Sequence, residues 1–136
     1  MMLCDTGPLV ALCDAKDPHH WVCAAAVEEL KSYTLLTTWP CLTEAMHLLR
    51  NAGGWRAQGR LWDFIPNGLL WLHSPADGEL ERMRALMRDY ADTPMDLADA
   101  SLVAAAETLR LRRVFTVDKH FYVYRQRQGQ AFEVVP

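Results

Sequence analysis

Residues 96–107 read DLADASLVAAAE, and this stretch decides the fold. Alanine and leucine dominate it, which favours a helix, and Pro94 just before it is typical of a first helical turn. The predicted helix continues to about residue 111. It is apolar on nearly every side, so we expect it to lie inside a core rather than on a surface.

Two carboxylates, Asp96 and Asp99, lie at the start of this helix, three residues apart and therefore on one face. Aspartate is a poor helix former and is rarely buried without a partner. A buried, unpaired carboxylate costs several kcal/mol or takes up a proton. The compensating group is the helix N-terminus, a nearby arginine or lysine, or a bound cation.

The length of 136 residues suits one domain, over residues 1–136, with a substantial core. With 17 acidic residues against 14 lysines and arginines, the net charge is −3. This balance argues against a general nucleic-acid coat protein but allows a local basic patch. No C-x-x-C pair occurs, and we expect reduced core thiols rather than disulfides or a zinc site at Cys4, Cys13, Cys23 and Cys41.

The first residues do not resemble a signal peptide, because Asp5 interrupts the opening apolar run and no basic segment precedes it. No apolar run approaches the roughly 20 residues that a membrane span needs. We therefore expect a cytoplasmic protein without a membrane segment.

Short apolar strands alternate with helices along the chain, which predicts an α/β domain with a mostly parallel sheet. We expect a three-layer α/β/α sandwich. The predicted strands cover residues 2–4, 35–39, 69–72, 114–117 and 132–135. The other predicted helices cover residues 8–13 with Pro8 as first residue, 18–31 capped by Asp17, 40–51 ended by Gly53-Gly54, 55–64 and 76–90.

Four carboxylates occupy matching positions in this pattern. Asp5 and Asp118 each follow an apolar strand, and Glu44 and Asp99 each lie early in an apolar helix. Right-handed crossovers gather the strand ends, and the helix starts that follow them, on one edge of the sheet. We therefore expect these four side chains to converge, with Asp96 beside them.

Carboxylates crowded together repel one another and take up protons unless a cation joins them. Oxygen ligands suit Mg²⁺ or Mn²⁺ rather than zinc. Such an ion can activate water and stabilise the charge on a phosphodiester. The predicted chemistry is metal-dependent hydrolysis of a phosphate backbone.

Four segments carry a family resemblance. They are DTGPLVAL at 5–12, LTE at 42–44, DLADA at 96–100 and TVD at 116–118. With them the chain resembles a PIN domain, and within that family the toxin ribonucleases of VapC type. The resemblance implies a PIN-like fold, RNA as substrate, Mg²⁺ or Mn²⁺ as cofactor, a homodimer and a small antitoxin partner.

The resemblance also implies roles for individual residues. Asp5, Glu44, Asp99 and Asp118 match the acidic quartet of the family, as catalytic residues and metal ligands, and Asp96 matches an additional metal-binding acid. We assign supporting or substrate contacts to Thr6, Thr116, Lys119 and Arg125.

A further RNA contact is predicted where charge and stacking combine, at Tyr122, Tyr124, Arg125 and Arg127. His120, next to Lys119, is a candidate for steering phosphate. The exposed apolar surface predicted around the second to fourth helices could receive an antitoxin helix. The tryptophans at 39, 55, 62 and 71 are expected in the core or on a dimer face.

Each acid also has a structural alternative. Asp5 could be a turn or capping residue before Pro8, Asp96 a first-turn capping acid, and Asp118 the cap of a short helix through Tyr122. Two functional alternatives remain as well. One is a PIN-like module that binds RNA or protein without cleaving, and the other is a metal phosphohydrolase of small substrates.

Overall fold

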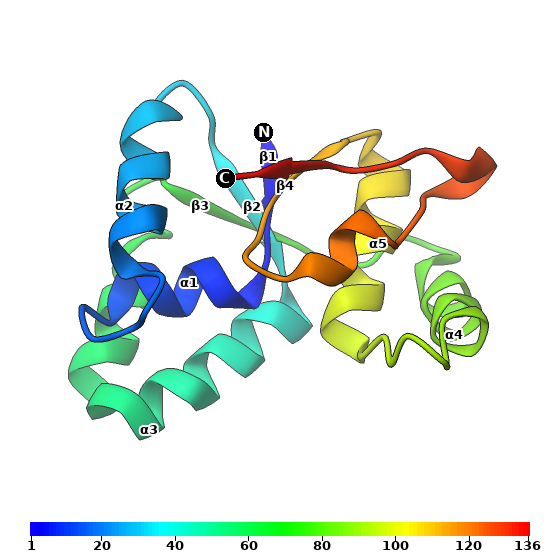
Figure 1. Cartoon of the computed structure of the whole chain (residues 1–136). Coiled ribbons are helices and arrows are strands. Elements are labelled where there is room, and N and C mark those ends of the chain that lie inside the picture. The colour runs from blue at the N-terminus through cyan, green and yellow to red at the C-terminus, as the bar shows by residue number, and fades with distance from the viewer.

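In the computed structural model, which describes residues 1–136, five strands form a single central sheet (Figure 1). The order across the sheet is β3-β2-β1-β4-β5, and every neighbouring pair is parallel. The strands are β1 (Met2–Cys4), β2 (Leu35–Thr38), β3 (Leu70–His73), β4 (Arg113–Phe115) and β5 (Glu133–Val135). The chain places β2 and β3 on one side of β1, and β4 and β5 on the other side. The ends of β1 and β4 therefore lie side by side.

Helices cover both faces of this sheet (Figure 1). One face carries α1, α2 and α3, and the other carries α4 and α5. The predicted three-layer α/β/α sandwich is therefore confirmed. The helices are α1 (Thr6–Cys13), α2 (His20–Glu29), α3 (Trp39–Asp63), α4 (Glu79–Asp89) and α5 (Leu97–Leu109), with short 3-10 turns η1 (Lys119–Tyr122) and η2 (Arg127–Gly129).

The two layers of core follow from the alternation of side chains along the strands. On β1, Leu3 faces the cluster formed with α5, whereas Met2 and Cys4 face the cluster formed with α1 and α3. All three side chains are fully buried. A strand buried on both faces explains why β1 is apolar at every position.

Helix α5 is the most buried helix, as its composition predicts. Every residue from Ala98 to Ala106 is buried. The helix begins at Leu97, because Asp96 is its N-cap. Pro94 therefore lies before the helix and not in its first turn, where it was expected. A capping side chain decides this boundary more strongly than the proline does.

The starts of α1 and α2 also differ from the prediction. Asp5 caps α1, so the helix begins at Thr6 and Pro8 is its third residue rather than its first. Helix α2 begins at His20 instead of residue 18, because the Asp17 side chain accepts a hydrogen bond from the His19 backbone and closes a turn there.

Trp39 belongs to a helix and not to a strand as predicted. Thr38 is the N-cap of α3 and its hydroxyl accepts a hydrogen bond from the Cys41 backbone at 3.5 Å, so the chain turns into the helix at Trp39. The two helices predicted at 40–51 and 55–64 follow one another within α3. The expected break falls at Gly54, whose φ of 64° interrupts the helical backbone.

The four cysteines are free and buried, as predicted. Of the two places predicted for the tryptophans, the core is wrong and a dimer face stays a prediction, because the side chains lie at the surface, with exposed fractions of 47% for Trp39, 72% for Trp55, 44% for Trp62 and 56% for Trp71. None of the helices has the length and apolar character that crossing a bilayer requires.

Candidate active site

Asp5 lies where β1 ends and α1 begins. Its Oδ1 accepts a hydrogen bond of 2.8 Å from the Thr6 backbone, which caps the helix. Its Oδ2 accepts a hydrogen bond of 2.8 Å from the Thr116 hydroxyl, just beyond β4. Both carboxylate oxygens are therefore held, and the side chain is buried with 6% exposure.

Asp118 follows β4, the neighbour of β1, through Thr116 and Val117. The Asp118 backbone donates to the Thr116 hydroxyl at 2.9 Å, so this one hydroxyl connects Asp118 with Asp5. Gly7 permits the approach of the two segments, because a Cβ at this position would lie 2.8 Å from Val117 Cγ2. The absence of a side chain in the first turn of α1 brings the two strand-end acids together.

The predicted capping alternative for Asp118 also holds. Its Oδ1 accepts a hydrogen bond of 2.9 Å from the His120 backbone and caps η1. The same oxygen lies 3.0 Å from His120 Nδ1. Capping and a functional role are compatible here, since Oδ2 takes no part in these contacts.

Asp99 and Asp96 form a capping box at the start of α5. Asp96 Oδ1 accepts a hydrogen bond of 2.8 Å from the Asp99 backbone, and Asp99 Oδ2 lies 3.4 Å from the Asp96 backbone nitrogen. Asp99 Oδ2 also accepts a hydrogen bond of 3.0 Å from the hydroxyl of Tyr124. Asp99 is buried, with 8% exposure, whereas Asp96 is exposed.

Glu44 comes from the second turn of α3. The Thr6 hydroxyl lies 3.4 Å from Glu44 Oε2 and from the Cys41 carbonyl oxygen, so Thr6 connects the starts of α1 and α3. Glu44 is half-buried. It lines the same cleft as Asp5.

These side chains meet in one cleft of about 370 Å³. Asp5, Asp99 and Asp118 each offer a carboxylate oxygen, and the three oxygens lie within 4.8 Å of one another. Glu44 and Asp96 line the same cleft but are not part of this closest group. Its walls hold five carboxylates and the imidazole of His120, and no lysine or arginine.

Burial, and to a smaller extent the charges of neighbouring carboxylates, raises the pKa of three acids in the cleft. Burial raises the pKa of Asp5 to about 6, against the effect of its hydrogen bonds from Thr116 and Thr6. Burial, and then the negative charges of Asp96 and Asp5, raise the pKa of Asp99 to about 7. Burial and the charge of Asp96 also raise the pKa of Glu44.

The residues of the cleft fit a hard divalent cation. Carboxylate oxygens are the ligands that Mg²⁺ and Mn²⁺ prefer, and no cysteine lines the cleft. A bound cation would also relieve the repulsion that raises the pKa of Asp5 and Asp99. Of the three compensating groups considered for Asp96 and Asp99, the helix N-terminus contributes and the cleft supplies no arginine or lysine.

The residues predicted for RNA contact lie in different surroundings, with Tyr124 buried and Lys119, Arg125 and Arg127 exposed. Tyr124 is fully buried, because its ring packs against Phe121 and its hydroxyl binds Asp99. Arg125 donates from Nη1 to the carbonyl oxygens of residues 122–124. Lys119 and Arg125 do not line the acidic cleft, and Arg127 is paired with Glu107 instead.

The contact between Tyr124 and Asp99 escapes prediction, because no local pattern distinguishes a tyrosine that reaches an acid across 25 residues. The TVD spacing at 116–118 does predict Thr116 at the site. Its hydroxyl, on a residue with 2% exposure, orients Asp5.

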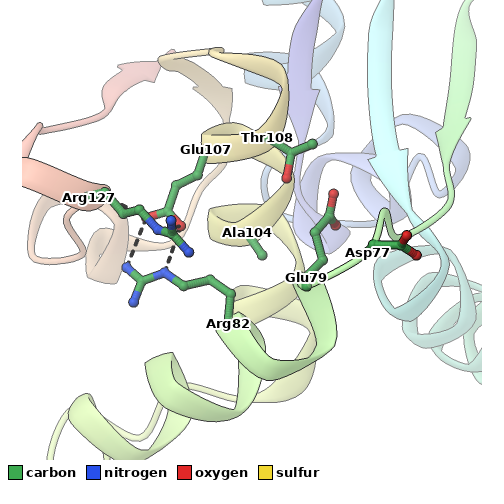
Figure 2. A pocket seen from close by; sticks show the side chains of 8 residues that line it. Asp77, Glu79, Arg82, Ala104, Glu107, Thr108 and Arg127 are labelled. Carbon is green, nitrogen blue, oxygen red and sulfur yellow. Dashed lines mark hydrogen bonds and ion pairs between the residues drawn. The ribbon is translucent and has the colours of Figure 1, made fainter.

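A second charged cavity, of about 230 Å³, lies between α4, α5 and η2 (Figure 2). Glu107 accepts hydrogen bonds of 2.7 and 2.9 Å from Arg82 and one of 2.7 Å from the Arg127 backbone. Its carboxylate also lies 3.5 Å from Arg127 Nε. Glu107 thus pairs with both guanidinium groups, so we assign this cavity a structural role.

The chain was compared with known proteins. No family model matches it. It is 26% identical over 136 residues to ribonuclease VapC26 of Mycobacterium tuberculosis (strain ATCC 25618 / H37Rv). The alignment covers 99% of this chain and 100% of the relative. Its structure superimposes on the crystal structure of VapC20 of Mycobacterium tuberculosis, titled a sarcin-ricin loop cleaving toxin, with a TM-score of 0.84, 18% identity and full coverage of both chains.

The fold, with its acidic cleft at the carboxyl edge of a parallel sheet, is that of a PIN domain. Together with the full-length similarity in sequence to a VapC ribonuclease, this fold makes the chain similar to PIN domains of the VapC type. The predicted family resemblance is therefore confirmed.

Proposed function

We propose that this chain is an endoribonuclease that hydrolyses RNA with the help of Mg²⁺ or Mn²⁺, and that it is the toxin of a toxin–antitoxin pair. The observation that carries the proposal is the group of three carboxylate oxygens within 4.8 Å, in a cleft without a lysine or arginine to neutralise them. The names of the two relatives, a ribonuclease and an RNA-loop cleaving toxin, support the same activity.

Asp5, Asp99 and Asp118 would hold the cation, with Glu44 and Asp96 at the margin of the site. When bound, a divalent cation supplies activation of water and stabilisation of charge on the phosphodiester. Thr116 and Thr6 N fix the carboxylate of Asp5, and Tyr124 orients that of Asp99. These contacts hold the ligand oxygens in place before the ion and the substrate arrive.

His120 is the one side chain of the cleft that can carry a positive charge. Its Nδ1 lies 3.0 Å from Asp118 Oδ1. We propose that it contacts a phosphate oxygen or carries a proton to the leaving oxygen. Lys119, on the exposed side of η1, would attract the RNA backbone from further out.

The partners follow from the same proposal. RNA is the substrate, a small antitoxin is the inhibitor, and two copies of the chain form a homodimer. The cytoplasm, where its RNA substrate would be found, is the proposed location. Trp62 on α3 and Trp21 on α2 offer exposed apolar surface for an antitoxin helix.

The test is cleavage of labelled RNA by the wild type, by Asp99→Asn and by the control Asp92→Asn, which alters an exposed acid outside the cleft. We expect Asp99→Asn to lower kcat/KM by at least about a hundredfold, since even residues that only support a metal ligand cost about 10–100-fold. The control should cleave like the wild type, and a chelator should stop both. Equal cleavage by wild type and Asp99→Asn would refute the proposal.

Two other outcomes identify the alternatives. A module that binds RNA without cleaving would show no Mn²⁺ uptake that depends on Asp5, Asp99 and Asp118, which calorimetric titration measures directly. A phosphohydrolase of small substrates would release phosphate from nucleoside monophosphates and leave RNA intact.

A further inference from the structure

A second groove, of about 600 Å³, opens beside the acidic cleft. One wall is the first two turns of α3, with Trp39, Pro40 and His47, and the other is the start of α5, with Leu97. Glu44 and Asp96 line both the groove and the cleft. The groove therefore continues the cleft and shares two of its carboxylates.

The groove is more apolar than the cleft. Trp39 is 47% exposed and Leu97 is 51% exposed, and both lie next to the shared acids. The Trp39 indole is also held in place, because its Nε1 donates a hydrogen bond of 3.3 Å to the Ser74 hydroxyl. A fixed aromatic face beside a phosphodiester-cleaving site matches the chemistry of a nucleobase joined to that phosphodiester.

We infer that Trp39 is the stacking platform for an unpaired base next to the scissile phosphate, with Leu97 as the opposite wall. The inference rests on the proposed ribonuclease activity, since it is the RNA phosphate in the acidic cleft that brings the base to the groove. A duplex cannot use this platform, because its bases are already stacked and paired. The groove thus selects single-stranded or looped RNA.

Stacking also explains how a chain with a net charge of −3 holds RNA. The walls of the groove contain no lysine or arginine, so its contribution is insensitive to salt, unlike contacts to phosphate. The same platform accepts any base, because every base has an aromatic face. Trp39 therefore sets a requirement for an unpaired nucleotide and not for a particular sequence.

The test measures binding of a labelled, short single-stranded RNA in the Asp99→Asn background, in which cleavage is removed. We expect Trp39→Ala to increase the dissociation constant by roughly ten- to a hundredfold and Trp39→Phe to increase it less. Trp55→Ala is the matched control, because Trp55 is 72% exposed on the same helix and lines neither groove nor cleft. Its affinity should equal that of the background protein.

A second measurement places the base. We use a set of RNAs that each carry one abasic residue, at successive positions. At one position the abasic residue should weaken binding to the protein with Trp39 but not to the Trp39→Ala variant. Unchanged affinity in Trp39→Ala, or equal losses in Trp39→Ala and Trp55→Ala, would overturn the inference. So would a shift from dimer to monomer in Trp39→Ala with unchanged RNA affinity, because a second copy would then cover the groove.

The two proposals fail separately. If the wild type cleaves RNA and Trp39→Ala cleaves it with unchanged KM, the stacking platform is wrong and the ribonuclease stands. If the wild type does not cleave but RNA binding depends on Trp39 and on one base, the groove stands and the ribonuclease falls.

Discussion

The Thr116 hydroxyl donates a hydrogen bond of 2.8 Å to Asp5 Oδ2, although 111 residues separate the two in the chain. The same hydroxyl accepts a hydrogen bond from the Asp118 backbone at 2.9 Å. The Thr116 hydroxyl thus connects two acids at the ends of neighbouring parallel strands. The arrangement follows from the pairing of β1 with β4, in which Cys4 faces Phe115.

Replacing this hydroxyl should weaken the site without unfolding the protein. We expect Thr116→Val, which keeps the shape of the side chain, to lower Mn²⁺ affinity about 10–100-fold, the usual cost of losing a partner of a metal ligand. It should also raise the pKa of Asp5, because the hydrogen bond from Thr116 lowers it. Titration calorimetry against pH checks both effects.

Thr116→Ser is the matched control, since it keeps the hydroxyl and loses only a methyl group. It should bind Mn²⁺ nearly as well as the wild type. If Thr116→Ser loses as much affinity as Thr116→Val, packing of the methyl group and not the hydrogen bond holds Asp5.

The raised pKa values predict how the stability of the metal-free protein depends on pH. The pKa rises from 3.8 to about 6 for Asp5 and to about 7 for Asp99. Between these values the folded chain binds more protons than the unfolded chain, so these two groups lower the free energy of unfolding as pH rises from about 4 to 7. Asp99→Asn should remove the contribution of Asp99 to this decrease. The variant should therefore be more stable than the wild type at neutral pH, by about 1 kcal/mol or more.

Thermal unfolding in a chelator, at several pH values, measures this effect. The difference in Tm between Asp99→Asn and wild type should grow from acid to neutral pH, and Mn²⁺ should raise the Tm of the wild type more than that of the variant. A wild type that is the more stable of the two at neutral pH without metal would contradict the prediction.

Asp96 combines a capping role with a negative charge near Asp99 and Glu44. Asn is as good a helix cap as Asp, so Asp96→Asn should keep the stability of α5, whereas Asp96→Ala should lose about 1 kcal/mol. Both variants should lower the pKa of Asp99, because the charge of Asp96 raises it.

Urea unfolding and Mn²⁺ titration of the two variants separate the roles of Asp96. The side chain lies outside the closest group of carboxylates, so we expect Asp96→Asn to keep Mn²⁺ binding that Asp99→Asn loses. Equal losses of Mn²⁺ affinity in Asp96→Asn and Asp99→Asn would mean that Asp96 is as important a metal ligand as Asp99.

Glu107 is predicted to matter for stability and not for cleavage. It joins α5 to Arg82 of α4 and to Arg127 near the C-terminus, with a side chain only 9% exposed (Figure 2). Glu107→Gln should lower the free energy of unfolding by about 2 kcal/mol, within the range for hydrogen bonds to charged groups. Glu28→Gln is the control, because its pair with Lys31 is 70% exposed on both sides and should cost less than about 1 kcal/mol.

The measurement is urea unfolding together with RNA cleavage. Glu107→Gln should keep the kcat/KM of the wild type at a temperature where both are folded. A loss of cleavage in folded Glu107→Gln would mean that the cavity between α4 and α5 takes part in the reaction.

The positions of the acids could be predicted because strand ends and helix starts are local features of the sequence. Asp5 and Asp118 each follow an apolar strand, and the parallel sheet brings such ends to one edge. The helix boundaries were less predictable. Capping by Asp5, Thr38 and Asp96 shifts the starts of α1, α3 and α5 relative to the nearby prolines.

The contacts that tune the site could not be predicted in the same way. Whether Tyr124 lies outside or reaches Asp99 depends on how the segment after β4 folds back over α5. The exposure of Trp39 likewise depends on the turn at Thr38, since in a strand the side chain would have joined the sheet. Both outcomes are decided by tertiary packing, which a window of neighbouring residues does not contain.

The use of aspartates as helix caps separates the activity of this chain from its shape. Asp5, Asp96 and Asp118 each begin a helical segment, and asparagine can begin one equally well. If the proposed activity holds, a single exchange of carboxylate for amide at Asp5 or Asp118 would silence the chain and leave it folded. Such a silent copy would still bind the proposed partners of the active one, so in a cell that carries both forms the inert one would act as a competitor.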